Sequence, residues 1–225
     1  MHHLLLEASL LVLLRHAESE RNAGKKGTYY TDEEKAALGN KANHNIVLTA
    51  KGHTQAKEAG AEFYKKYGTF DIVINSGYLR TRETMEGVLY AYTKEERERT
   101  LILEDIALRE RDSGYTYHMT ENEADGHFPW NKESWSINGP FFSRPAGGES
   151  LADVTARLDT FFTRLAMICK EKKVLLVGHG RLFVAAQSLL ENWKHEDYQK
   201  LPTELENACH LEYAYSKEKR MLIRA

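Results

Sequence analysis

The sequence predicts an α/β fold, a three-layer sandwich with a mostly parallel central sheet and helices on both faces. Apolar runs at residues 10–14, 70–75 and 173–178 are too short for helices and show little polar alternation, which is typical of strands buried on both faces. Helical patterns at 49–68 and 79–92 lie between these runs. Alternation of strands with helices favours a parallel sheet with both faces covered.

The remaining elements follow in chain order. The apolar start is interrupted by Glu7, lacks a basic leader and is too short to span a bilayer, so we interpret it as a frayed terminus that leads into the first strand. The 49–68 helix has Thr49 as its cap and Gly68 as its stop. A further helix over 149–173 begins at Ser150, and Asp153 three residues later resembles a capping box.

In residues 210–225, at the end of the chain, apolar and polar residues alternate, a turn follows, and the alternation resumes. This pattern predicts a C-terminal hairpin at the edge of the sheet. With 225 residues, of which 42% are hydrophobic, we expect a single domain over 1–225.

Two segments depart from the strand–helix pattern. Residues 23–47 are polar, with a short helical piece at 31–38, and residues 111–147 mix aromatic residues, histidine, glycine and proline. We expect both to be insertions that form a lid over a binding site, because long irregular segments in compact domains often have that role. An ordered surface loop without function is the alternative for each.

Composition excludes several classes of protein. A formal net charge of −2 argues against a general binder of nucleic acid or of a membrane surface, since such binders need a predominantly positive electrostatic potential. Cys169 and Cys209 make no disulfide framework, and the histidines have no metal-ligand spacing, so we expect a cytoplasmic protein with no metal and no other cofactor. The sequence leaves the oligomeric state open.

Cationic and polar residues follow three of the predicted strands. Ligands collect beyond the carboxyl ends of strands in such sheets, so we expect these side chains to share one crevice. Any one of them could instead be a structural histidine or a solvated arginine. Together they predict a site for a small dianion, and the residues are Arg15, His16, Ser76, Arg80, His179 and Gly180.

Six short motifs are spread over nearly the whole chain; they are RHAESERN (15–22), LTAKGHTQA (48–56), SGYLRTRET (76–84), LRERDSG (108–114), GGES (147–150) and LLVGHG (175–180). In type and order they resemble the motifs of the histidine phosphatase superfamily, which has a phosphoglycerate-mutase-like fold. The first motif has Ala17 where the family usually has glycine.

The resemblance implies a metal-independent phosphatase that acts on a small phosphomonoester. His16 would be the nucleophile and form a phosphohistidine, with its second ring nitrogen fixed by a hydrogen bond. Arg15 and Arg80 would hold the non-bridging oxygens with planar guanidinium groups, and His179 and Asn22 would donate further hydrogen bonds.

The leaving group needs a general acid, and the resemblance places it at Glu110. Glu110 could instead be a surface glutamate paired with Arg109 or Arg111. Glu83, on the Arg80 helix, is the second candidate for the acid.

Two other functions remain open. A phosphoglycerate-mutase-type phosphotransferase would use the same pocket, but the chain lacks most of the mutase run after Asn22 and the cations after Glu110 that clamp a carboxylated substrate. A regulatory pseudoenzyme that binds a phospho-ligand would need the arginines but neither nucleophile nor acid. The 111–147 segment offers aromatic residues and few cations, which would tolerate a sugar or an aromatic leaving group, but these aromatics could equally anchor the lid to the core.

Overall fold

The structure is a computed structural model that describes residues 6–225 except 26, 28, 195 and 220. Within that part of the chain, six strands form one sheet in the order β3-β2-β4-β1-β5-β6. The first four are mutually parallel, whereas β5 and β6 are antiparallel and form the predicted hairpin at one edge. The strands are β1 (Leu10–Arg15), β2 (Ile72–Asn75), β3 (Leu101–Glu104), β4 (Lys173–Gly178), β5 (His210–Ser216) and β6 (Met221–Arg224).

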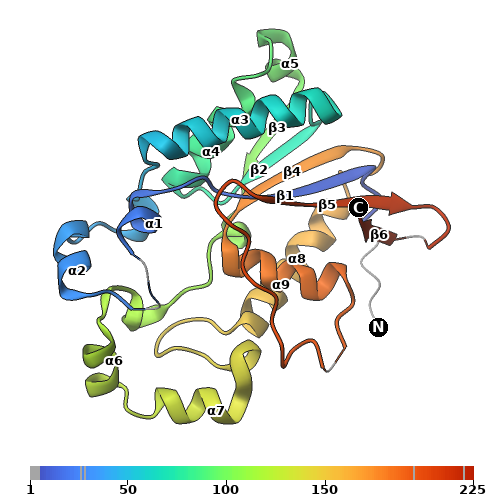
Figure 1. The fold of residues 1–225 in the computed structure, drawn as a ribbon. Helices are drawn as coiled ribbons and strands as arrows, with labels where there is room; N and C mark the ends of the chain where they lie inside the picture. Colours follow the sequence, from blue (N-terminus) through green and yellow to red (C-terminus); the bar gives the residue numbers. More distant parts are fainter. Residues whose placement is uncertain (1–5, 26, 28, 195, 220) are drawn as a thin grey trace.

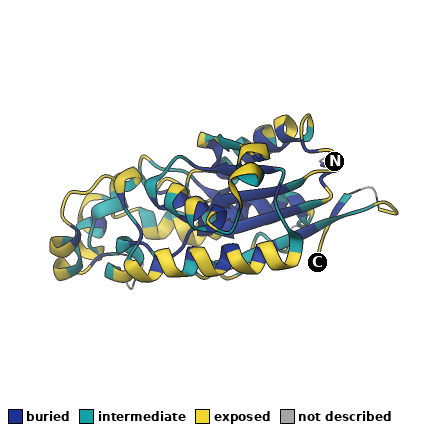
Figure 2. Cartoon of the chain, turned by 90° about the horizontal axis from the view of Figure 1, so that it is seen from above, coloured by how far each residue is buried: buried dark blue, intermediate teal, exposed yellow. Residues whose placement is uncertain are grey.

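Side chains of the central strands alternate between two apolar layers. In β1, Leu11 and Leu13 belong to one core cluster, and Val12 and Leu14 belong to the other. Strand β4 divides in the same way, since its apolar residues also point alternately to opposite faces. The apolar runs without polar alternation are therefore strands with both faces buried, as the sequence predicted (Figure 2).

Helices cover both faces of the sheet. Figure 1 shows α3, α4 and α5 on one side and α8 and α9 on the other, while α1, α2, α6 and α7 lie to one side of the sandwich. Short 3₁₀ turns occur at Asn43–Asn45, Ile106–Leu108 and Gly114–His118. The α-helices are α1 (Glu20–Gly24), α2 (Asp32–Leu38), α3 (Ala50–Tyr67), α4 (Leu79–Leu89), α5 (Lys94–Arg99), α6 (Glu121–His127), α7 (Asn131–Phe142), α8 (Leu151–Ala166) and α9 (Gly180–Leu190).

Helices α3 and α4 pack closely because small residues face each other. A Cβ atom added at Gly60 would lie 2.5 Å from the carbonyl oxygen of Val88, and one added at Gly87 would lie 2.5 Å from the Cβ of Ala56. These two glycines thus set the distance between the helices, and α4 carries Arg80.

Most predicted elements are confirmed with small shifts at their ends. Thr49 caps α3, Gly68 ends it with a φ of 70°, and Ser150 and Asp153 form the expected capping box of α8. The helix expected over 149–173 ends at Ala166, however. The next residues form a turn in which the amide of Cys169 bonds back to the carbonyl of Leu165.

Three regions differ from the sequence prediction. Strand β3 and helix α5 were not predicted, because the short β3 lies at the sheet edge with a mostly half-exposed surface and so lacks a continuous buried pattern. The helix expected over 79–92 ends at Leu89. The 111–147 segment is largely helical rather than irregular.

Of the apolar start expected to be a frayed terminus, residues 1–5 lie outside the described residues. The residues that follow are not frayed, because Leu6 and Ala8 are buried in the core and the carbonyl oxygen of Glu7 accepts the amide of Glu171.

Candidate active site

His16 follows β1 directly and is buried, with 4% of its surface exposed. Its Nδ1 lies 2.8 Å from the carbonyl oxygen of Ala17, and its Nε2 lies 3.2 Å from Nε of Arg80. Because the arginine can only donate, Nε2 of His16 is an acceptor and Nδ1 carries the proton given to Ala17. The ring is thus fixed in the tautomer that a nucleophilic Nε2 requires.

Arg80 connects His16 to the second histidine. Its Nη2 lies 3.3 Å from Nδ1 of His179, and its Nη1 donates to the carbonyl oxygen of Asn43 at 2.7 Å. Nε2 of His179 lies 2.9 Å from Oγ of Ser76. His179 is therefore an acceptor at Nδ1 and a donor at Nε2 when neutral, so it can donate to a phosphoryl oxygen through Nδ1 only after it gains a proton.

Burial and the arginine keep both histidines neutral. Desolvation, followed by the charge of Arg80, lowers the pKa of His16 and that of His179 well below the ordinary value. Burial also lowers the pKa of Arg80 to about 10, which leaves it protonated at neutral pH. The cluster consequently carries positive charge on an arginine between two neutral imidazoles, an arrangement that favours an anion.

Arg15, the last residue of β1, points its guanidinium toward the C-terminal part of the chain. Nη1 donates to the carbonyl oxygen of Leu205 and lies 3.8 Å from Oε2 of Glu204. Its Nε is buried without a hydrogen-bond partner among the described residues. A buried donor without a partner costs free energy that an anion accepting its hydrogen bond would restore.

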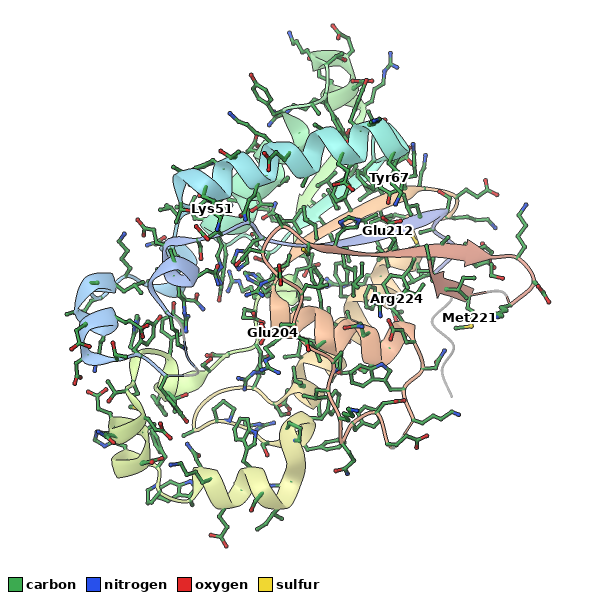
Figure 3. The ribbon with its side chains drawn as sticks, in the orientation of Figure 1. Lys51, Tyr67, Glu204, Glu212, Met221 and Arg224 are labelled. Atoms are coloured by element: carbon green, nitrogen blue, oxygen red, sulfur yellow. The ribbon has the colours of Figure 1, made fainter. Side chains whose placement is uncertain are left out.

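Glu204 lies close to the start of α9, near the centre of the molecule (Figure 3). Its Oε1 is 2.5 Å from Nε of Arg181, and a Cβ added at Gly180 would lie 2.2 Å from its Oε2. Sequence reasoning missed this residue, because nothing in the pattern around it marks a segment that folds back on the site.

The LTAKGHTQA motif supports the loop that follows His16, the predicted nucleophile. The amide of Glu18 donates to Oε1 of Gln55 at 2.9 Å, and the amide of Thr49 donates to the carbonyl oxygen of Glu18 at 3.0 Å. A Cβ added at Gly52 would lie 2.0 Å from that same carbonyl oxygen. The glycine is required because the helix backbone touches the loop after His16.

Asn22 lies in the first turn after the nucleophile loop. Its Oδ1 accepts hydrogen bonds from the amide and hydroxyl of Ser19 and from Nδ2 of Asn207. The Nδ2 of Asn207 also lies 3.0 Å from the carbonyl oxygen of His16. Asn207 was not identified from the sequence, and it ties the predicted donor Asn22 to the nucleophile's backbone.

Glu110 lies at the amino end of α9. Oε1 accepts from the amides of Arg111 and Leu182 at 2.8 and 3.1 Å, and Oε2 accepts from the amide of Arg181 at 3.4 Å. The alternative of an ion pair with Arg109 or Arg111 is not found among the described contacts, since Arg111 donates to the carbonyl oxygen of Glu149 instead. Glu110 therefore lies at the first turn of the helix that His179 precedes.

Glu83, the second candidate for the acid, is used elsewhere. Its Oε2 accepts the amide of Leu48 at 2.7 Å and so holds the segment that leads into α3. This contact gives Glu83 a structural role. Glu110, which also accepts backbone amides, stays the predicted acid.

A pocket with a volume of about 470 Å³ lies between α1 and the residues after it, the 111–147 segment and the start of α9. Its lining includes Arg111 and Arg181 but none of His16, Arg80 and His179. The 111–147 segment contributes only two of the cations around this pocket, and the others come from other segments. Five cations line the pocket, namely Arg21, Lys25, Arg111, Lys132 and Arg181.

The acidic residues of the 111–147 segment do not line this pocket. Within α6, Glu123 pairs with Lys35, and Asp125 and Glu121 pair with Lys132. Within the described residues, no three His, Cys, Asp or Glu side chains are grouped so as to hold a metal ion. None of the helices in that part of the chain is long and apolar enough to cross a membrane.

The fold is a mostly parallel sheet covered by helices on both faces. Two histidines at the carboxyl edge of this sheet contact the same arginine, so the protein belongs to a class of α/β proteins suited to bind a small anion. A family model described as the histidine phosphatase superfamily (branch 1) matches residues 11–224. The chain belongs to this superfamily, as its motifs indicated.

Curated relatives with similar sequences are named 2,3-bisphosphoglycerate-dependent phosphoglycerate mutase. The one from Nitrobacter hamburgensis is 32% identical over 196 residues, which cover 85% of each chain. The one from Parvibaculum lavamentivorans is 31% identical over 175 residues, covering 76% of this chain and 75% of the relative.

Solved structures share the fold at lower identity. A mycobacterial glucosyl-3-phosphoglycerate phosphatase in complex with VO3 has a TM-score of 0.70 and 22% identity, with 97% of each chain covered. A putative alpha-ribazole-5'-P phosphatase from Escherichia coli has a TM-score of 0.72 and 19% identity, covering 97% of this chain and 95% of the other.

Proposed function

We propose that the protein is a phosphatase that hydrolyses a small phosphomonoester through a phosphohistidine on His16, without a metal ion. The observation that carries the proposal is the pair of contacts on His16. Nδ1 donates to Ala17 while Nε2 keeps its lone pair toward Arg80, so a phosphoryl group bound to Arg80 would face the nucleophilic nitrogen.

The reaction divides into two displacements on phosphorus. Nε2 of His16 forms a bond to phosphorus while the bond to the leaving oxygen breaks, and Glu110 gives that oxygen a proton. A water molecule then attacks the phosphohistidine, the P–N bond breaks, and Glu110 takes the proton from the water. Arg80, and Arg15 once it leaves Leu205, neutralise the equatorial oxygens in both steps.

The first test of this function uses 4-nitrophenyl phosphate in the presence of a chelator. We expect turnover by the wild type, unchanged by the chelator, and a loss of about three orders of magnitude or more in His16→Ala, because the nucleophile is gone. His53→Ala, on the exposed face of α3, is the matched control. Turnover by His16→Ala close to that of the wild type would overturn the proposal.

A mutase is the second candidate, favoured by the names of the curated relatives and by the cations of the pocket. The two functions differ in the fate of the phosphohistidine, because a mutase must shield it from water until a second hydroxyl accepts the phosphoryl group. The choice of a phosphatase over a mutase rests on the absence of most of the mutase run after Asn22.

Quenched-flow measurement of the phosphoenzyme, combined with an assay of phosphoglycerate isomerisation, distinguishes the two functions. We expect the phosphoenzyme to lose its phosphoryl group to water within one turnover, and no interconversion of 2- and 3-phosphoglycerate with a bisphosphorylated primer present. A phosphoenzyme that persists for minutes, with primer-dependent isomerisation, would make the protein a mutase.

A further inference from the structure

The GGES motif packs backbone to backbone against the LRERDSG motif, which contains the predicted acid. A Cβ added at Gly148 would lie 2.4 Å from the carbonyl oxygen of Asp112, and one added at Gly114 would lie 2.2 Å from that of Ala146. Gly114 also has a φ of 57°, a conformation that glycine adopts without strain. The two motifs therefore form one structural unit, at a distance that larger residues would not allow.

Glu149, the acidic residue of GGES, holds the chain that follows Glu110. Its Oε2 accepts the amide of Asp112 at 3.0 Å, and its own amide donates to the carbonyl oxygen of Asp112 at 2.9 Å. Its carbonyl oxygen accepts Nη1 of Arg111 at 3.1 Å. These hydrogen bonds fix the two residues after the predicted acid.

Arg157, on α8, holds the chain that precedes Glu110. Its Nη1 donates to the carbonyl oxygen of Ala107, and its Nη2 donates to that of Arg109 at 2.8 Å and lies 3.4 Å from that of Glu110 itself. A lysine could not bond to all these oxygens together, because its ammonium lacks the planar fork of arginine.

The guanidinium of Arg157 and the carboxylate of Glu149 also bind each other. Nε and Nη2 of Arg157 lie 2.9 and 3.1 Å from Oε1 and Oε2 of Glu149, and the two side chains are only 22% and 28% exposed. Two parallel hydrogen bonds in a half-buried place make this pair more rigid than a single contact between exposed charges. Arg157 and Glu149 thus form a clamp that grips the segment on both sides of Glu110.

The place of the Glu110 carboxyl group depends on the backbone that the clamp holds. Its Oε1 accepts the amides of Arg111 and Leu182, so it reaches the start of α9 only while its own segment stays in position. An acid must lie within hydrogen-bond distance of the leaving oxygen, and a displacement of 1 Å can cost about 10²-fold in rate.

We infer that Arg157 and Glu149 are positioning residues for Glu110. Among the described residues the clamp has no hydrogen bond to His16 or Arg80, so it acts on the proton given to the leaving oxygen and not on the binding of the phosphoryl group. This inference rests on the proposed phosphatase function and on Glu110 as its acid.

Arg157→Lys, assayed on phenyl phosphate and 4-nitrophenyl phosphate, tests the clamp, because the phenolate needs the acid more than the nitrophenolate does. We expect kcat for phenyl phosphate to fall about tenfold, kcat for 4-nitrophenyl phosphate to fall less than about twofold, and both KM values to stay within about twofold. Lysine keeps the positive charge, which contributes, after burial and the charge of Arg80, to the lowered pKa of His179.

Arg164→Lys is the matched control, since this exposed arginine of the same helix pairs with Asp105. It should behave as the wild type does on both substrates. Glu149→Gln should reproduce the effect of Arg157→Lys, and it takes the place of that variant should the latter fail to fold.

A double variant shows whether the clamp acts through the acid. Added to Glu110→Gln, Arg157→Lys should cause no further loss of kcat on phenyl phosphate, because the group that it positions is gone. Equal losses on both substrates in the clamp variants, or a further loss in the Glu110→Gln background, would overturn the inference and leave the phosphatase proposal standing.

Hydrogen exchange followed by mass spectrometry tests the clamp without turnover. In Arg157→Lys we expect the amides of 107–112 to exchange about tenfold faster and those of α3 to exchange as in the wild type. Unchanged exchange of 107–112 would overturn the inference whatever the activity. Faster exchange together with a wild type that hydrolyses neither substrate would instead overturn the phosphatase proposal, and with it the acid that the clamp positions.

Discussion

At the scale of single residues, Arg80 has the most connected position in the site. It donates to His16, His179 and the backbone of Asn43, and it reaches them from the first turn of α4. A bound phosphoryl group must take over some of these hydrogen bonds, so substrate and histidines compete for the same guanidinium. Lysine could not replace it, because its ammonium lacks the planar, multiply donating geometry.

Glu110→Gln should have an effect that depends on the leaving group. An acid assists the departure of an alkyl alkoxide much more than that of a nitrophenolate, which leaves without a proton. We expect kcat for an alkyl phosphate to fall by about 10²-fold or more and kcat for 4-nitrophenyl phosphate to fall far less. Steady-state kinetics on both substrates measures the difference.

Glu83→Gln is the matched control for that experiment, because Glu83 bonds to the backbone of Leu48. Equal losses on the two substrates in Glu110→Gln would give Glu110 a positioning role at the start of α9. A leaving-group dependence found in Glu83→Gln alone would make Glu83 the acid.

The sequence located single residues well wherever a strand end dictated their position. His16 and His179 follow β1 and β4, and Arg80 lies one turn after β2, so topology alone placed them together. The sequence did not identify Asn207 and Glu204, which lie in a segment without regular structure. The spatial position of such residues depends on tertiary packing that no local pattern encodes.

At the scale of elements, the contact between α3 and α4 depends on two glycines. Gly60→Ala should destabilise the protein by about 1–3 kcal/mol, because the new methyl group would overlap the backbone of Val88. Denaturation by urea, followed by circular dichroism, measures the free energy of unfolding.

Gly126→Ala is the control for that prediction, since a Cβ added at Gly126 in α6 meets nothing within 4 Å. It should be neutral or stabilise by up to about 1 kcal/mol, as alanine favours a helix. Equal stability of Gly60→Ala and the wild type would show that the two helices move apart at no cost.

Helix α3, which has both a cap and a glycine stop, was predicted from the sequence almost to the residue. The ends of α4 and α8 were placed too late, because no such stop follows them. The 111–147 segment was harder, because Gly139 and Pro140 interrupt α7 and its helical pattern is weak. The sequence shows the acidic residues of this segment but does not predict their ion pairs with Lys35 and Lys132, since such pairs depend on how the helices pack.

At the scale of the whole molecule, the two buried histidines make stability depend on pH. Both are neutral in the folded protein because their pKa values are lowered, whereas in the unfolded chain they take up protons near pH 6.5. The unfolded state therefore binds more protons below that pH, and the free energy of unfolding falls as the pH falls.

Replacing His16 by glutamine should reduce this dependence. Between pH 6.5 and 5.5 we expect the wild type to lose about 1 kcal/mol more than His16→Gln, which lacks one of the two protonation sites. His53→Gln, at an exposed position, should behave as the wild type does. Urea unfolding across this range provides the measurement, and parallel pH profiles for wild type and His16→Gln would contradict the prediction.

We expect Glu204 to compete with a bound anion for the predicted anion site. Its carboxylate lies near Arg15, on Arg181 and over Gly180, so an incoming phosphate must displace a ligand that is held at high effective concentration. This competition lowers the affinity of the site for every anion by the same factor. Orthophosphate, the proposed product, has no further contacts to offset the loss and should depart readily, whereas the organic part of a substrate can add contacts. The chain's own carboxylate would thereby limit product inhibition.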